Sequence, residues 1–188
     1  MNKDYKGLLK LLKYHKVKYV IIGNYAYSCY VIPRSTSDLD ILIESTRENA
    51  EKMVKVLENF DFKPENLKWR YFAEKGNKIQ LGHEPLIIDI LTSIPGVTWN
   101  EVWKNRVRGV FGNANILVNF IGEKQLIKCK KTSSRLQDLV DYKFLIGNIK
   151  EADGLKHLAD AEQLKKSLRK RNSENSNLMN ITFERLVH

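Results

Sequence analysis

The chain has 188 residues, of which 43% are hydrophobic and 29% are charged, so it is long enough to bury a core and has the composition of a soluble globular protein. No apolar run approaches the roughly 20 residues that span a membrane, and the N-terminus carries no signal-peptide pattern, so a cytoplasmic location is expected. The net charge of +10 favours attraction to nucleotides and nucleic acids without sequence-specific reading, and Cys29 and Cys129 lack the spacing of a zinc site.

The N-terminal part of the sequence predicts a helix, a strand and a second helix. Leucines at helical spacing predict a helix over Tyr5–Tyr14, and an apolar run predicts a buried strand over 18–22. Gly23 ends this strand, and residues 24–30 are expected to be helical. A strand that turns through glycine into a helix aims backbone N–H groups and the positive end of the helix dipole at one point, which suits a triphosphate.

Two carboxylates open the next predicted strand. Asp38 and Asp40 share one face of that strand, because successive side chains point to opposite faces, and Leu39 and Ile41 take the other face. Like charges in an apolar strand repel each other and lose hydration, and a hard divalent cation such as Mg²⁺ neutralises them. The alternative is a strand-entry turn in which both aspartates are solvated caps.

A third carboxylate interrupts a later apolar run. The pattern Ser45-x-x-Glu48 predicts a capping box at the start of a helix, and residues 68–91 favour strands, the last of which carries Asp89. A lone buried aspartate is costly unless it is paired or bound to a cation. Asp89 therefore completes a three-carboxylate cluster if its strand lies beside that of Asp38; the alternative is a hydrogen bond to a neighbouring loop.

The rest of the predicted elements complete an α/β fold, with a mixed β-sheet flanked by helices. They are a turn at Pro95-Gly96, a short helix over 99–103, a hairpin of 107–110 and 116–120 around Gly112-Asn113, and a helical region over 123–146 that breaks near 132–134. The apolar stripe on the last helix is assigned to core packing and consists of Leu136, Leu139, Val140 and Phe144.

These residues resemble the minimal nucleotidyltransferases of the DNA polymerase β superfamily, and more narrowly the bacterial nucleotidyltransferase-like proteins of the abortive-infection and toxin–antitoxin type. The resemblance runs from about Tyr19 to Leu145. It rests on the Gly23 turn, Pro33-Arg34-x-Thr36-x-Asp38-x-Asp40, Ile88-Asp89-Ile90-Leu91, and Lys130 with Arg135-x-x-Asp138-x-x-Asp141. Family members usually carry Gly-Ser or Gly-Gly where this chain has Gly23-Asn24.

The resemblance implies a nucleotidyltransferase fold and two-metal transfer of a nucleoside monophosphate from an NTP to a hydroxyl. Asp38 and Asp40 are implied to bridge two Mg²⁺ ions, with Mn²⁺ as a substitute, and Asp89 to hold the catalytic ion near the attacking hydroxyl. The implied nucleotide-binding residues are Gly23, Asn24, Arg34, Thr36, Lys130 and Arg135, with Asp138 and Asp141 as supports that hold the two later cations in place. Arg34 and Thr36 either brace the Asp-x-Asp loop or contact the substrate. For Arg135, Asp138 and Asp141 the alternative is an exposed series of charged residues at helical spacing.

The predicted organisation is a nucleotidyltransferase-like domain over 1–148 and a basic helical extension over 149–188, whose last part is compatible with a disordered tail. The basic cluster over 165–171 is either a solvated face or a surface for RNA or an acidic partner. The implied partners are an NTP, a protein or RNA acceptor, and a toxin or antitoxin. The rival interpretation is a non-catalytic module that keeps the fold and binds nucleotide, RNA or a partner toxin.

Overall fold

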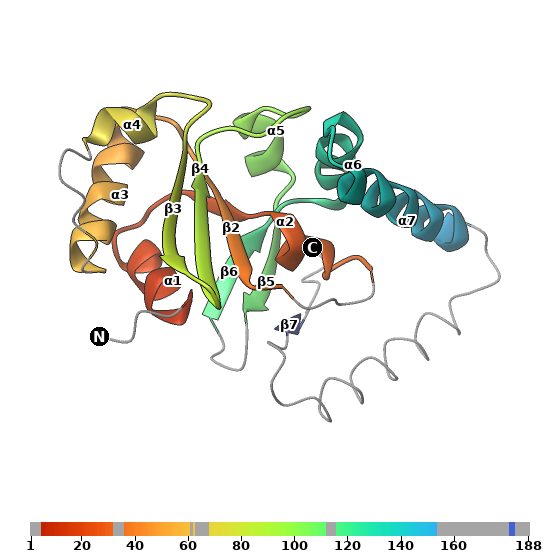
Figure 1. Cartoon of the computed structure of the whole chain (residues 1–188), viewed down its shortest axis with the longest axis horizontal. Helices are drawn as coiled ribbons and strands as arrows, with labels where there is room; N and C mark the ends of the chain where they lie inside the picture. Colours follow the sequence, from red (N-terminus) through yellow and green to blue (C-terminus); the bar gives the residue numbers. More distant parts are fainter. Residues whose placement is uncertain are drawn as a thin grey trace.

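The computed structural model of the chain describes residues 5–31, 36–60, 62, 68–111, 116–153 and 181–182. Its centre is a mixed β-sheet with the strand order β3-β4-β2-β1-β6-β5-β7, and helices surround it (Figure 1). The strands are β1 (Tyr19–Ile21), β2 (Asp38–Ile43), β3 (Lys78–His83), β4 (Leu86–Leu91), β5 (Val107–Phe111), β6 (Ile116–Phe120) and β7 (Ile181–Thr182). The helices are α1 (Tyr5–Tyr14), α2 (Gly23–Tyr27), α3 (Arg47–Asn59), α4 (Trp69–Ala73), α5 (Trp99–Lys104), α6 (Glu123–Thr132) and α7 (Leu136–Asp153). The predicted α/β architecture with a mixed sheet is confirmed.

Parallel and antiparallel pairings alternate from β3 to β5, and β7 is also antiparallel to β5. Strand β2 is parallel to β4 and β1 is parallel to β6, whereas β1 with β2, β3 with β4, and β5 with β6 are antiparallel. The predicted hairpin of β5 and β6 is confirmed, and β6 joins the sheet that carries the aspartates through its pairing with β1. The turn expected at Gly112-Asn113 lies outside the described residues.

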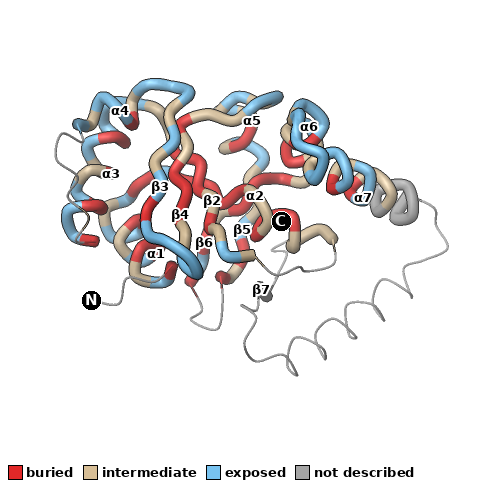
Figure 2. Tube along the Cα trace, viewed as in Figure 1, coloured by how far each residue is buried: buried red, intermediate tan, exposed pale blue. Residues whose placement is uncertain are grey.

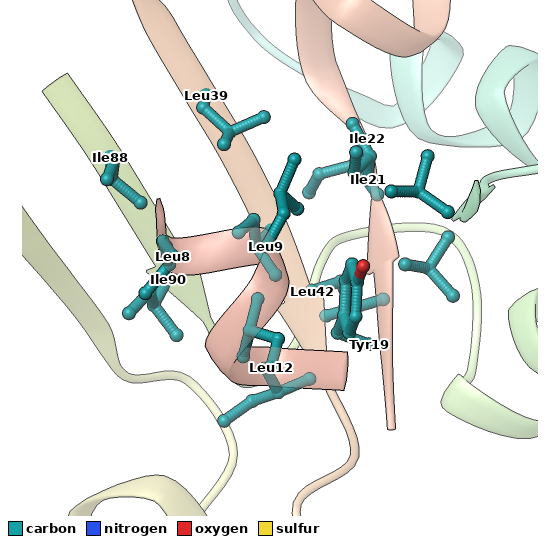
Figure 3. Packing of buried hydrophobic residues seen from close by; sticks show 14 of the residues in the cluster. Leu8, Leu9, Leu12, Tyr19, Ile21, Ile22, Leu39, Leu42, Ile88 and Ile90 are labelled. Carbon is teal, nitrogen blue, oxygen red and sulfur yellow. The ribbon is translucent and has the colours of Figure 1, made fainter. Parts of the chain in front are cut away.

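Helix α1 covers one face of the sheet and leaves the aspartates on the other. The side chains that meet at this covered face include Leu8, Leu9 and Leu12 of α1 and Leu39, Ile88 and Ile90 of the sheet (Figure 3). Because side chains alternate along a strand, Asp38 and Asp40 point to the face opposite α1. The edge strand β3 is mostly exposed, whereas the middle of β4 is buried (Figure 2).

Two local predictions between β2 and β3 are wrong. Residues Trp69–Ala73 form the short helix α4 and not a strand, because the aromatic segment packs on α3 and buries Phe72 there. Helix α3 is capped by Thr46, whose hydroxyl accepts from the backbone N–H of Asn49 at 3.3 Å. The predicted cap, Ser45, instead donates to the carbonyl of Thr92 at 2.6 Å, so the capping box does not form there.

The prediction that the stripe on α7 packs into the core is also wrong. The side chains of Leu136, Leu139, Val140 and Phe144 are 81%, 39%, 45% and 57% exposed. The break between α6 and α7 is where the sequence places it, but α7 turns a different face inward. That face carries Asp138, Asp141 and Leu145, and its two carboxylates form ion pairs with Lys130 of α6. The ion pairs explain why α7 is rotated away from its apolar stripe.

The domain division at residue 148 and the basic extension remain predictions. Helix α7 continues to Asp153, and residues 154–180 and 183–188, which include the basic cluster and the Ser- and Asn-rich segment, lie outside the described part of the chain. In that described part, no helix combines the length and the apolar character needed to cross a membrane.

Candidate active site

Asp40 and Asp89 lie side by side on two neighbouring parallel strands. They are direct partners in the register of β2 and β4, and Asp38 is paired in the same register with Ile87. Side chains of paired residues on the same face of a sheet are neighbours, about 5 Å apart at Cβ. The strand pairing on which the predicted three-carboxylate cluster depends is therefore present, and residues far apart in sequence meet at one place in the sheet.

Asp89 is a buried carboxylate with one paired and one unpaired oxygen. The residue is only 6% exposed. Its Oδ2 lies 2.6 Å from Nζ of Lys78, while its Oδ1 is buried and has no hydrogen-bond partner among the described residues. A buried anionic oxygen without a donor is costly, and hard divalent cations bind such oxygens. The donor chemistry at Asp89 therefore fits a Mg²⁺ ligand.

The carboxyl group of Asp40 has a raised pKa. Burial raises the pKa of Asp40 from its ordinary 3.8 to about 6, and the carboxylates of Asp89 and Asp38 contribute to this rise, against a lowering by Lys78 and Lys130. Burial and the two neighbouring carboxylates disfavour the charged form of Asp40, whereas the two lysines favour it. A cation at this position would stabilise the ionised form of Asp40.

The three carboxylates are not gathered into a closed metal cage. Among the described residues, no group of three or more His, Cys, Asp or Glu side chains has an arrangement that could hold a metal ion. Asp89 is paired through Oδ2 with Lys78, and Asp38 accepts a hydrogen bond at Oδ1 from the hydroxyl of Ser37 at 2.9 Å.

The Gly23 turn lies directly against Asp40. Gly23 has a φ of +64°, and a Cβ at this position would lie 1.9 Å from Oδ2 of Asp40. The adjacent backbone N–H of Ile22 donates to the carbonyl of Asp40 at 3.0 Å. Only glycine provides both the left-handed backbone and the space for this carboxylate. The predicted proximity of the turn and the Asp-x-Asp strand is what the structure has.

The helix after this turn is shorter than the sequence suggests. Helix α2 has 5 residues, ends at Tyr27, and has no side-chain cap at Ile22. Its dipole therefore contributes little, since the macrodipole needs aligned peptides over several turns. The amide Nδ2 of Asn24 donates to Oγ1 of Thr36 at 3.4 Å. Any phosphate binding here would depend on backbone N–H groups and nearby cations.

Thr36 connects the turn to the strand of the aspartates. Besides accepting from Asn24, its hydroxyl accepts from the backbone N–H of Asp38 at 3.3 Å. These contacts agree with the bracing role among the two roles considered for Thr36. Arg34, for which the same two roles were considered, lies outside the described residues.

Lys130 is a buried cation held by two carboxylates of α7. Its Nζ contacts Oδ1 of Asp138 and lies 2.9 Å from Oδ2 of Asp141. Lys130 is 8% exposed, and its charge lowers the pKa of Asp40. Arg135 is exposed, and no described carboxylate is within ion-pair distance of it. Asp138 and Asp141 thus form ion pairs with Lys130, and the charge of Arg135 contributes to lowering the pKa of Asp138.

We expect Asp138→Asn to lower the free energy of unfolding by about 1–2 kcal/mol near neutral pH, because it weakens the charge-assisted contact with Lys130. Burial acts to raise the pKa of Asp138, but hydrogen bonds from Lys130 and Ser133 outweigh it and lower the pKa below its ordinary 3.8. A lowered pKa stabilises the fold above the ordinary value, and this contribution is lost as pH falls through the folded-state pKa.

Urea denaturation at neutral pH and in acid checks this prediction. The difference between wild type and Asp138→Asn should shrink in acid. Glu51→Gln is the control, because it breaks an exposed ion pair with Arg47 of 2.9 Å and should cost less than about 0.5 kcal/mol. Equal losses in the two variants would mean that Lys130 is not specifically held.

Sequence reasoning missed two residues of this site. Lys78 was not considered, although the strand pattern around it contained the signal: in an antiparallel pair, residues two positions from the direct partner are diagonal neighbours, and Gln80 is the direct partner of Asp89. Tyr5 was assigned only to a packing helix, but its hydroxyl donates to the carbonyl of Ser37, just before Asp38. No local pattern indicates such a contact.

No family model and no curated protein matches the sequence. The solved structures to which the chain is similar include an antibiotic adenylyltransferase and an antibiotic-resistance factor. One is a crystal structure of the lincosamide antibiotic adenylyltransferase LnuA with lincomycin bound, at 17% identity and a TM-score of 0.47, covering 77% of this chain and 96% of that one. The other is a solution structure of the antibiotic-resistance factor ANT(2'')-Ia, at 10% identity and a TM-score of 0.45, covering 90% and 95%. At these values the likeness carries no conclusion about the residues or substrates of this chain.

Proposed function

We propose that this chain transfers a nucleoside monophosphate from an NTP to a hydroxyl on a protein or an RNA. The supporting observation is the direct pairing of Asp40 and Asp89 on adjacent parallel strands, against the Gly23 turn. One of these carboxylates has a buried oxygen without a described partner, and the other has a pKa raised to about 6. Such a cluster is costly for folding, and perturbed acids of this kind are concentrated at functional sites.

In this proposal, Asp38, Asp40 and Asp89 are the residues that hold Mg²⁺. When bound, Mg²⁺ supplies Lewis-acid stabilisation of the transferring phosphoryl group. Asp89 is also the base for the attacking hydroxyl, because a second oxygen of its carboxylate has no other described partner. The triphosphate is bound by backbone N–H groups of the Gly23 turn and by Lys130, which gives two of its three donors to Asp138 and Asp141.

The acceptor and the biological context are further parts of the proposal. A net charge of +10 suits an RNA acceptor or an acidic protein surface. The resemblance to abortive-infection and toxin–antitoxin proteins suggests a defence role with a paired toxin or antitoxin. A second candidate, a non-catalytic module that binds nucleotide, RNA or a toxin, is favoured by the Lys78–Asp89 ion pair, which neutralises one carboxylate without a metal.

Labelled NTPs separate these two functions. The full chain is incubated with Mg²⁺, protein or RNA acceptors, and each NTP labelled at either the α- or the γ-phosphate. Transfer of a nucleoside monophosphate is expected to leave the α-label, but not the γ-label, on the acceptor. The label should be absent with Asp40→Asn and retained with Glu58→Gln, an exposed carboxylate of α3. Nucleotide binding without label on any acceptor would favour the non-catalytic module.

A further inference from the structure

Lys78 and Lys130 both lower the pKa of Asp40, but the two lysines differ in exposure and in the number of their ion-pair partners. The side chain of Lys130 is 10% exposed and is fixed between two carboxylates. The side chain of Lys78 is 54% exposed, is located on the edge strand β3, and has a single ion-pair partner among the described residues, Asp89. One lysine is therefore part of the packed structure, and the other can leave its partner by rotation of its flexible stem.

The position of the Lys78 ammonium follows from the register of the sheet. Gln80 of β3 is the direct partner of Asp89, and Lys78 is paired with Leu91. Lys78 and Gln80 are on the same face as Asp89, because residues two apart on a strand share a face. From this diagonal position Nζ reaches Oδ2 of Asp89 at 2.6 Å. The ammonium of Lys78 therefore lies on the face of the sheet that carries the aspartates. It lies on the β3 side of Asp89, whereas Asp40 lies on the β2 side.

This ion pair does not satisfy Asp89. The carboxylate is buried, and its Oδ1 has no described partner even with Lys78 in place. An ammonium is a point charge with three donors, and a single half-exposed lysine offsets only part of the desolvation cost of a buried carboxylate. A small divalent cation offers twice the charge and coordinates oxygens directly. The site accordingly holds a weak cation where a stronger one fits.

We propose that Lys78 is an exchangeable counter-ion, which occupies Asp89 in the metal-free protein and is displaced when a divalent cation binds. The inference rests on the proposed function. The carboxylate of Asp89 is paired through Oδ2 with Lys78, while its Oδ1 has no described partner, so that the lysine and a metal ion compete for the same carboxylate. Lys78 is then a residue that sets metal affinity: it stabilises the metal-free fold and weakens metal binding by competition.

Binding of Mn²⁺, followed by electron paramagnetic resonance, tests the competition without measuring activity. Lys78→Met should bind Mn²⁺ about fivefold more tightly than wild type, which is the scale expected from loss of a half-exposed ion pair. Lys78→Arg keeps the charge and should bind as wild type does. Lys52→Met is the matched control, because it breaks an ion pair of the same 2.6 Å length with Glu48 on α3, and its affinity should not change. Equal or weaker binding by Lys78→Met overturns the proposal.

Chemical labelling of the wild-type protein separates displacement from a general charge effect. An amine-reactive ester is applied with increasing Mn²⁺, and modified lysines are quantified by mass spectrometry. Labelling of Lys78 should rise with the same midpoint as metal binding, because a released ammonium reacts faster, while labelling of Lys52 stays constant. Metal binding with unchanged labelling of Lys78 would show that the ion pair persists and would overturn the proposal.

The outcome is separable from that of the proposed function. If Mn²⁺ affinity and Lys78 labelling follow the expectation but no α-label is transferred, the counter-ion role stands and the nucleotidyltransferase proposal fails. If α-label is transferred but Lys78→Met has wild-type Mn²⁺ affinity, the opposite holds. If neither wild type nor Lys78→Met binds Mn²⁺, both proposals fail.

Discussion

Asp40→Asn is expected to make the metal-free protein more stable and to abolish its transfer activity. Burial, together with Asp89 and Asp38, raises the pKa of Asp40 from 3.8 to about 6. A raised pKa means that the ionised form is less stable in the folded chain than in the unfolded one, by about 2–3 kcal/mol for a shift of this size. An amide carries no charge at any pH, so the substitution removes this penalty.

The raised pKa of Asp40 determines how the stability gain of Asp40→Asn depends on pH. Below the ordinary pKa of 3.8 the carboxyl is protonated in both states, and Asp40 imposes no penalty. The penalty grows as pH rises toward the folded-state pKa of about 6 and is complete above it. Urea denaturation with chelator should therefore show a gain of about 2 kcal/mol for Asp40→Asn in mild alkali and almost none in acid.

Activity should change in the opposite direction. Loss of one metal-binding carboxylate is expected to lower NMP transfer by about a thousandfold or more, because the metal supplies several kcal/mol of transition-state stabilisation. Glu58→Gln, on the exposed side of α3, should change neither stability nor transfer. A variant that is less stable than wild type in mild alkali would show that Asp40 serves the fold and not a cation.

The sequence predicted those parts of the site that depend on strand alternation. Asp38 and Asp40 share a face opposite Leu39 because this is a property of any strand, and the apolar runs around Asp40 and Asp89 indicated buried neighbours. The in-register pairing of β2 with β4 was a condition of the prediction and could not be read from either strand alone. Register is set by which face of each strand is buried in the tertiary structure.

Side-chain partners chosen by tertiary structure were not predictable in the same way. The stripe of Leu136 and Phe144 has the spacing of a core face, yet α7 is oriented by the ion pairs of Lys130. Helix α7 can either bury its apolar stripe or pair the buried Lys130. Leaving a buried charge unpaired costs more free energy than leaving apolar side chains exposed. Lys78 was overlooked for a related reason, because a lysine on an edge strand is ordinarily a solvated residue.

Gly23→Ala is expected to damage both the fold and the site, because Gly23 provides a left-handed backbone and space for a carboxylate at the same position. At φ +64° an alanine is strained by about 1–2 kcal/mol. In addition, its Cβ would lie 1.9 Å from Oδ2 and 2.7 Å from Cγ of Asp40, so that the carboxylate must move. A total loss of about 2–4 kcal/mol in stability is expected, with roughly a hundredfold loss of transfer from the displaced ligand.

Two comparisons separate strain from displacement of Asp40. Gly76 has a φ of +89°, but a Cβ at that position would meet no described atom within 4 Å, so Gly76→Ala should show the backbone strain alone and keep its activity within a few-fold. In an Asp40→Ala background the carboxylate is absent and only the Cβ of residue 40, at 3.0 Å, remains, so Gly23→Ala should then cost little more than Gly76→Ala does. The excess cost in the wild-type background measures the coupling between turn and carboxylate. If Gly23→Ala costs the same in both backgrounds, Gly23 is only a tight turn, and the close approach of the turn to Asp40 has no part in the site.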